Sequence, residues 1–392
     1  MKWGIDYKRE VIQDKISEWE RVDSAGYSLP YSSQTVQISD ILRSDFDLNS
    51  NRFSGFFQDS WLIGDSSAAS LTFGARFQYW DVNKEFLVSP RVQFAIKPFK
   101  KDVVLKLAGG AYMQPPFYRE MRNLDGVVNL DLKAQKSIHA VAGIDYNFKS
   151  WDRDFKFVTE LYYKYMWDLV PYELDNVLIR YFGQNSASGY AAGIDLRLHG
   201  EFIEGAESWV GMSIMQTEED ISNDSFERYL LDDGTEIPRA LIKFAESVDT
   251  ITEFPGNIPR PTDQRVSFSI FFQDYIPNND NFKVHLNLLF GTGLPFGPPD
   301  NERYRDQLRI PSYRRLDVGF SALLYSKERR IEKKGASSSF LKSVWATAEI
   351  YNLLGISNTV SYLWIKDFRN TSYAVPNFLT SRRVNVRVIA KF

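Results

Sequence analysis

The sequence predicts an all-β protein, an antiparallel transmembrane β-barrel. Three observations indicate it: apolar side chains recur at alternate positions, the connections between these segments alternate between short and long, and aromatic residues are abundant. Side chains alternate across a strand, so a barrel wall shows an apolar outer set with a polar or small inner set between its members. The C-terminal segment shows this plainly, with Val384, Val386 and Val388 on one side and Asn385 and Arg387 on the other. Such a strand suits a wall between lipid and water.

An edge strand of a soluble β-sandwich would show the same pattern in a single segment. Repetition along the chain favours the barrel, because the alternation recurs in many segments. In chain order, the apolar sides of five further segments begin Ile138-Ala140-Ala142-Ile144, Tyr190-Ala192-Ile194-Leu196, Val266-Phe268-Ile270-Phe272, Val284-Leu286-Leu288-Phe290 and Leu316-Val318-Phe320-Ala322. The positions between them mix charges with Gly and Ser, as in Gly193-Asp195 and Asp317-Gly319. That mixture is typical of a crowded, wet lumen rather than of a solvent-facing sheet.

The composition agrees with this fold class and excludes others. The chain has 392 residues, of which 25% are charged, its mean hydropathy is −0.33, and no stretch of about 20 apolar residues could cross a bilayer as a helix. An aromatic content of 15% suits interfacial girdles, and Tyr162, Tyr163, Tyr165 and Trp167 cluster near one expected strand end. A net charge of −3 argues against a nucleic-acid partner. The absence of cysteine excludes disulfides and thiolate metal sites.

Alternation places about fourteen strands along the chain. They cover residues 2–22, 51–63, 68–82, 86–98, 102–113, 134–148, 154–170, 188–203, 207–217, 263–276, 282–292, 312–325, 341–352 and 383–392. The short connections are 64–67, 99–101, 149–153, 204–206 and 277–281, and the long ones are 23–50, 114–133, 171–187, 218–262, 293–311 and 353–382.

Short and long connections alternate, which is typical of outer-membrane barrels with tight periplasmic turns and long external loops. Two connections break the rule, since 83–85 is short among the long ones and 326–340 is long among the short ones. The alternation of strand direction along the chain is unchanged by these two exceptions. It places the terminal Phe392 at the periplasmic rim.

Eight short motifs resemble those of the TonB-dependent outer-membrane receptors. They lie in family order at residues 55–61, which is similar to the aromatic-Gln-Asp strand, 71–77, 89–92, 110–118, 291–296, 313–319, 351–354 and at Arg383. The fourth departs from the family pattern, because Tyr112 stands at the usual Phe and Glu120 comes one residue late. Each motif is degenerate alone, but eight in the correct order are specific.

The resemblance implies about 22 strands that close around an N-terminal plug, whereas this sequence has room for about fourteen. Residues 1–7 are already expected in a strand, with no signal peptide before them and no plug-like stretch after them. We therefore expect residues 1–392 to be the C-terminal part of the barrel of a longer receptor, whose plug and first strands lie outside the sequence. Alone, the two unpaired strand edges would cost several kcal/mol per unsatisfied group in lipid.

The function that the resemblance implies is energy-coupled uptake of a scarce, bulky nutrient across the outer membrane of a Gram-negative bacterium. An iron chelate, cobalamin, an oligosaccharide or a peptide would fit. The implied partners are outer-membrane lipid, a TonB-type energy-coupling complex that acts through the plug, and the barrel-assembly machinery, which would bind through Phe392. The alternative is a passive structural or adhesive outer-membrane barrel without a plug.

Residues at the outer mouth are the expected ligand contacts, because external loops and the upper inner wall combine aromatic and charged side chains. The candidates leave one strand on the outer side or lie in the next outer loop, and they are Met113, Gln114, Phe117, Tyr118, Arg119, Tyr172, Arg180 and Tyr181. The simpler alternative is that Pro115 and Pro116 stiffen the loop and the aromatic residues belong to the girdle.

No catalytic constellation emerges, so we expect neither an enzyme nor a cofactor. The three histidines, His139, His199 and His285, fall at inner positions far apart in sequence, which favours polar lumen side chains over metal ligands. The acidic run 218–220 with Asp224 lacks the spacing of a calcium loop, and a solvated loop is expected there.

Overall fold

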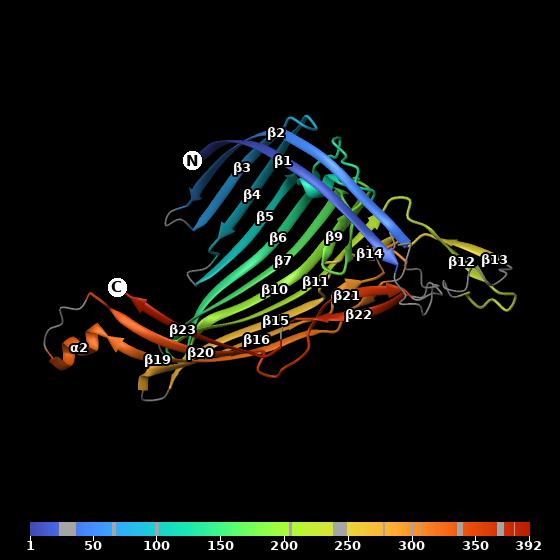
Figure 1. The fold of residues 1–392 in the computed structure, drawn as a ribbon. Helices are drawn as coiled ribbons and strands as arrows, with labels where there is room; N and C mark the ends of the chain where they lie inside the picture. Colours follow the sequence, from blue (N-terminus) through green and yellow to red (C-terminus); the bar gives the residue numbers. More distant parts are fainter. Residues whose placement is uncertain are drawn as a thin grey trace.

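A computed structural model shows one dominant antiparallel sheet that curves into a wide wall (Figure 1). The structure describes residues 1–22, 37–64, 68–98, 102–203, 206–237, 249–276, 279–298, 302–305, 307–334, 340–366, 372–379 and 381–392. The sheet has 15 strands, and all except β14 follow one another in a single up-and-down path. The predicted antiparallel arrangement is therefore confirmed.

The strands of this path lie beside one another in chain order. They are β1 (Lys2–Val22), β2 (Gln37–Ile63), β3 (Ala69–Trp80), β4 (Glu85–Ile96), β5 (Val103–Gln114), β6 (Gln135–Ser150), β7 (Arg153–Leu169), β10 (Ala187–Ile203), β11 (Ala206–Ile221), β15 (Val266–Ile276), β16 (Asn279–Gly291), β19 (Tyr313–Ser326), β20 (Ser343–Tyr351) and β23 (Arg383–Lys391). The short strand β14 (Asn257–Pro259) pairs with β11.

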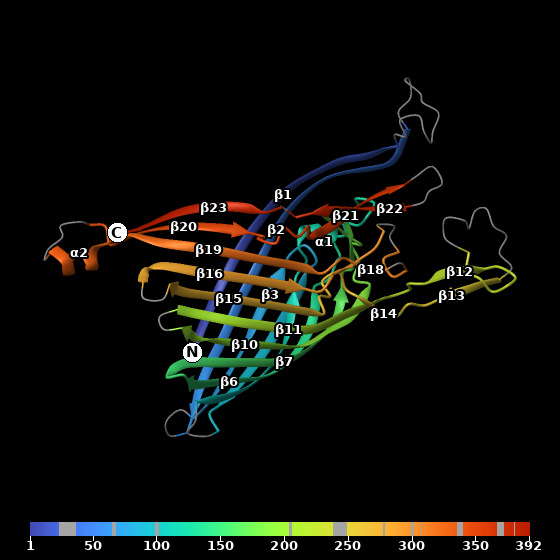
Figure 2. The same cartoon turned by 90° about the horizontal axis from the view of Figure 1, so that it is seen from below.

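Four small hairpins and one short helix gather at one end of the wall, as the long connections predicted (Figures 1 and 2). These are α1 (Tyr118–Met121), β8 (Tyr172–Asp175) with β9 (Leu178–Tyr181), β12 (Phe226–Leu230) with β13 (Asp249–Glu253), β17 (Pro295–Phe296) with β18 (Leu308–Arg309), and β21 (Thr359–Lys366) with β22 (Ser372–Phe378). Both chain ends lie at the opposite end, together with α2 (Lys327–Lys334) in the one long connection there.

The start of β2 differs from the expectation, which placed residues 37–50 in a loop. β2 begins at Gln37 and pairs with β1 as far as Val22, so the two strands extend together beyond the rest of the sheet (Figure 2). The apolar outer pattern is lost there because Arg43 and Asp45 occupy the positions that continue the outer side of β2. Phe46 and Leu48, on the other side, pack in the apolar cluster at the loop end. The backbone pairing does not depend on that pattern.

The inner and outer sides of the wall differ as predicted. On the outer side of β23, Val384, Val386 and Val388 are 72%, 71% and 64% exposed, and in the described residues no second large sheet packs against them. A sandwich would bury these side chains. On the inner side, the carboxylate of Asp145 lies 2.7 Å from Nζ of Lys106 and 3.0 Å from Nζ of Lys156, which stand on the two neighbouring strands.

The edge strands β1 and β23 each pair on one side only within the described sheet. That part of the chain also contains no helix with the length and apolar character needed to cross a bilayer. Whether further strands complete a larger barrel stays a prediction.

A glycine on the inner wall allows two polar side chains to meet across a strand. Gly319 on β19 stands between His285 on β16 and Glu349 on β20, and Nε2 of His285 lies 3.1 Å from Oε1 of Glu349. The same carboxylate accepts a bond from Nδ2 of Asn385 at 2.8 Å. Because residue 319 has no side chain, a row of polar groups can connect the four strands β16, β19, β20 and β23 on the inner side.

Gly319→Ala would place a methyl group 2.0 Å from Nε2 of His285 and push the imidazole off Glu349. Overpacking costs about 1–3 kcal/mol, so we expect a lower midpoint of urea-induced unfolding for the membrane-extracted protein. Gly211→Ala, on the same inner side, is the matched control, because the nearest atom there is the rotatable hydroxyl of Ser269 at 3.3 Å. Equal midpoints for the two variants would contradict this assignment.

Candidate functional site

The segment that follows β5 is anchored to the inner side of the wall. Met121 and Leu132 are fully buried, and they pack with Leu48, Trp80 and Val170 of the surrounding wall and loops. Burying large apolar side chains contributes about 1.5–3 kcal/mol each. The segment is therefore a fixed part of the mouth.

Glu120 organises the short helix α1. Its Oε2 accepts a hydrogen bond from the backbone N of Phe117 at 2.9 Å, and its Oε1 accepts one from Nε2 of Gln135 at 2.9 Å. Burial raises the pKa of the Glu120 carboxyl, although these bonds and the nearby Arg52 oppose that effect. Glu120 thus joins the helix to the start of β6.

Tyr118 and Arg122 fasten α1 to β1. The Tyr118 hydroxyl donates to Oδ2 of Asp14 at 2.9 Å, and Arg122 forms an ion pair with the same carboxylate. The Tyr118 ring stacks on Phe46 with centroids 6.3 Å apart. Burial raises the pKa of Tyr118 and lowers that of Arg122. Tyr118 thus helps to hold α1 against β1.

The β8–β9 hairpin brings the second group of candidates to the same place. Tyr181 packs against the apolar cluster that includes Met121, as Tyr118 does. Tyr172 lies against Tyr181 with ring centroids 5.6 Å apart, and Arg180 pairs with Asp175 at 3.5 Å. Burial raises the pKa of Tyr172 and of Tyr181. The structure therefore unites residues that are about sixty positions apart in the sequence.

The candidates differ in how far they remain open to a ligand. Phe117 is 63% exposed, and Arg119 and Gln114 are also exposed. Met113 is half-buried, and its backbone pairs with that of Lys136. The preceding residue, Tyr112, lies on the inner side, so Met113 lies on the outer side of the strand. The structure does not bring Met113 together with the other candidates.

Two buried carboxylates were missed by the sequence analysis. Glu219, which was expected in a solvated loop, is 1% exposed and pairs with Nε of Arg260 at 2.8 Å and with Arg303. Asp263 is fully buried and pairs with Arg265 at 2.8 Å and with Arg309. The solvated-loop expectation was wrong, because residues 218–220 belong to β11 and Asp224 is also buried. Glu219 can be buried because arginines from distant segments neutralise it.

These ion pairs fix the segment around β17 and β18 across β11. The signal in the sequence was the number of arginines in or just after the two long loops 218–262 and 293–311, namely Arg260, Arg265, Arg303, Arg305 and Arg309. Removal of one partner from a buried pair leaves an uncompensated charge and costs about 3–5 kcal/mol. The loops at this end are therefore held by specific contacts.

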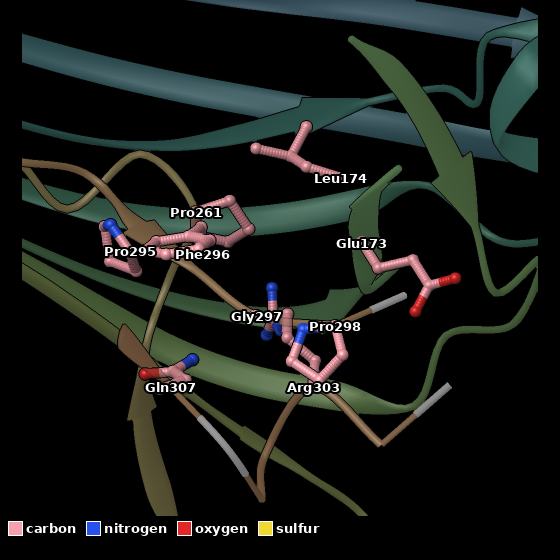
Figure 3. A pocket seen from close by; sticks show the side chains of 9 residues that line it. All are labelled: Glu173, Leu174, Pro261, Pro295, Phe296, Gly297, Pro298, Arg303 and Gln307. Atoms are coloured by element: carbon pink, nitrogen blue, oxygen red, sulfur yellow. The ribbon is translucent and has the colours of Figure 1, made fainter. Parts of the chain in front are cut away.

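A small pocket with a free volume of about 20 Å³, the room of one water molecule, lies between the β8–β9 hairpin and the loop that carries β17 (Figure 3). Its lining is mainly apolar and consists of Leu174, Pro261, Pro295, Phe296, Gly297 and Pro298, with Glu173, Arg303 and Gln307 as polar members.

No group of three or more His, Cys, Asp or Glu residues is placed to hold a metal ion in the described part of the chain. The His139 ring stacks on Tyr112 with centroids 4.2 Å apart, and its Nε2 lies 2.8 Å from the Ser137 hydroxyl. His285 faces Glu349 as described above.

A family model described as "TonB dependent receptor-like, beta-barrel" matches residues 2–353. The chain belongs to this family. Its members are outer-membrane proteins of Gram-negative bacteria, and the chain is an outer-membrane β-barrel protein. No curated protein sequence matches it.

Several solved structures have the same fold as this chain. The outer membrane transporter YddB from Escherichia coli superposes with a TM-score of 0.57 at 11% identity, covering 98% of this chain and 50% of that one. The ferric-catecholate import receptor Fiu from E. coli gives 0.57 at 10% identity, with coverages of 98% and 51%. The ferric enterobactin receptor PfeA from Pseudomonas aeruginosa, in complex with enterobactin, gives 0.57 at 13% identity, with coverages of 88% and 46%. The chain thus spans about half the length of these TonB-dependent receptors.

Asp14→Asn tests the anchoring of α1. The change removes the charge that faces Arg122 and weakens the bond from Tyr118, and a hydrogen bond to a charged group is worth about 1.5–3 kcal/mol. We expect amide hydrogen exchange in residues 115–134 to become at least about tenfold faster.

Lys15→Gln on the same strand is the matched control, because its ion pair with Asp45 at 3.4 Å is exposed on both sides and contributes little. If exchange in residues 115–134 is unchanged in Asp14→Asn, the Asp14 contacts do not anchor the helix.

Proposed function

We propose that this chain forms the ligand-capturing part of a barrel that imports a scarce, bulky nutrient across the outer membrane with energy from a TonB-type complex. Residues 1–392 are the C-terminal part of the barrel, and the plug and first strands lie outside the sequence. The partners are outer-membrane lipid, the energy-coupling complex acting through the plug, and the assembly machinery binding through Phe392. The role is transport, without catalysis.

The observation that carries this proposal is the convergence of two loops on one apolar cluster at the loop-bearing end of the wall. Their anchoring leaves Phe117 and Arg119 exposed on either side of Tyr118, which packs on the same apolar cluster as Tyr181. Aromatic faces and a guanidinium on a rigid frame bind a bulky ligand by stacking and ionic contacts, with little loss of side-chain freedom. An iron chelate, cobalamin, an oligosaccharide and a peptide all have the size for such a mouth.

Binding and import divide between the loops and the plug in this mechanism. The anchored loops hold the ligand near the outer mouth, and the plug rearranges under pull from the periplasmic side. The wall stays rigid because every strand of the path is paired along most of its length and the inner charges link neighbouring strands. A passive barrel is the less favoured alternative, because the family match covers residues 2–353.

The double variant Phe117→Ala/Arg119→Ala in the full-length receptor tests the contact residues. Loss of an exposed aromatic and a charged contact at a binding site costs about 1–2 kcal/mol or more, so we expect at least about tenfold weaker uptake at low ligand concentration. The measurement is uptake of labelled ferric chelates, cobalamin, oligosaccharides and peptides by cells that depend on the receptor.

Phe254→Ala is the matched control, since this side chain is 77% exposed on the distant β12–β13 arm. Receptor levels in the membrane should be equal in all three strains. Unchanged uptake by the double variant would end the assignment of these residues, and uptake that persists after the proton-motive force is dissipated would favour the passive barrel.

A further inference from the structure

A basic helix stands at the end of the wall opposite the outer loops. α2 (Lys327–Lys334) lies in the long connection between β19 and β20, near the C-terminus (Figures 1 and 2). Its eight residues include five lysines and arginines and two glutamates. A turn between antiparallel neighbours needs only a few residues, as the connection from β15 to β16 at the same end shows. The helix is therefore more than a turn requires.

Contacts with neighbouring strands fix the position of α2. The guanidinium of Arg329 donates to Oδ1 of Asn281 and lies 3.9 Å from Oδ2 of Asp280, both at the start of β16. The backbone N of Lys327 donates to the O of Lys342 at 2.8 Å, just before β20. These contacts hold the first half of α2 against the rim of the wall.

The spacing along α2 puts two cations and one apolar side chain on the side away from Arg329. Residues three and four positions apart are neighbours on a helix, so Lys327, Arg330 and Ile331 share one side. Arg330 is exposed, and Ile331 is 41% exposed. Neither Lys327 nor Arg330 forms an ion pair with another described residue. Two cations therefore remain for an anionic partner.

An exposed aromatic pair marks the level of the bilayer beside α2. Phe340, which precedes β20, stacks on Phe392 with ring centroids 4.9 Å apart and an interplanar angle of 14°. The two side chains are 76% and 62% exposed. Phe392 continues the outer side of β23 that carries Val384, Val386 and Val388. Aromatic side chains on the outer side of a barrel end form its interfacial girdle, so the connection that carries α2 returns at the layer of the lipid headgroups.

We propose that α2 binds the anionic headgroups of phospholipids in the leaflet at this rim. Lys327 and Arg330 pair with headgroup phosphates, as in phosphatidylglycerol, while Phe340 and Phe392 lie in the interfacial layer. Attraction of a basic helix to an anionic bilayer grows with each lysine or arginine near the surface. An acidic protein would match the charges of α2 but would leave the exposed phenylalanines in water. Binding of this kind needs only the outer-membrane location and is independent of import.

A fluorophore on α2 of the full-length receptor provides the test. Ile331→Cys carries an environment-sensitive label, and any cysteine outside residues 1–392 is replaced by serine. The labelled receptor is reconstituted in phosphatidylcholine bilayers with increasing amounts of phosphatidylglycerol. We expect the emission to move to shorter wavelength as phosphatidylglycerol increases at low salt. The shift should be lost in concentrated NaCl, because salt screens the attraction.

The labelled double variant Lys327→Gln/Arg330→Gln tests the two cations. Loss of two charges near an anionic surface should raise the phosphatidylglycerol fraction at the half-maximal shift at least about fivefold. Lys97→Gln/Lys149→Gln, with the same label, is the matched control. It removes the same charge from two exposed lysines in other turns of the same rim. This control should respond as the labelled parent does.

Absence of a shift with phosphatidylglycerol at low salt, or equal responses of the two double variants, would overturn the inference. A shift with soluble polyglutamate but not with phosphatidylglycerol would assign α2 to an acidic protein partner and would also overturn it. The comparison of bilayers needs no charge variant, so it decides the matter even if a substitution disturbs α2. Uptake is not measured in any of these experiments, so the proposed function stands or falls separately.

Discussion

The structure depends on one constraint, the need of every backbone N–H and C=O group in a lipid environment to find a partner within the protein. Antiparallel pairing of neighbours meets it for the strands between β1 and β23, while β1 and β23 themselves pair on one side only within the described sheet. Since side chains alternate across each strand, the same pairing separates an apolar outer side from a polar inner side. The fold and the distribution of charge are therefore one consequence of the same requirement.

The loop end obeys a different rule, because water is present there and loops can fold on one another. Apolar contacts around Met121 and ion pairs of Glu219 and Asp263 anchor these loops to the wall. Few of these contacts join neighbours in sequence: Arg303 and Glu219 are far apart along the chain, as are Asn176 and Asn377. Anchored loops give this end of the wall a defined set of exposed aromatic and cationic groups, as the proposed capture of a ligand requires.

Much of the wall could be predicted from sequence because period-two patterning is local and the bilayer enforces it on every strand. The alternation alone predicted which side of the last strand carries Val384, Val386 and Val388. The pattern fails in the first part of β2, which begins at Gln37 and pairs with β1 although the outer positions there, such as Arg43 and Asp45, are polar. The contacts of the candidate site were harder to predict than the strands. Proximity of Tyr118 to Tyr181 could be expected only in outline, and burial of Glu219 could not, because its arginine partners come from separate loops.

The central claim is that alternate residues of these strands touch lipid while their neighbours touch an enclosed aqueous space. Residues 1–392 contain no cysteine, so a single cysteine placed from 138 to 147 on β6 is unique in this part of the receptor. With any cysteine elsewhere replaced by serine, it can carry a spin label in the full-length receptor reconstituted in bilayers. Collision rates with oxygen should peak at 138, 140, 142 and 144, and those with a water-soluble nickel chelate at 139, 141, 143 and 145, with a period of two. Accessibility without this alternation, or water-soluble quencher reaching both sets equally, would contradict the account.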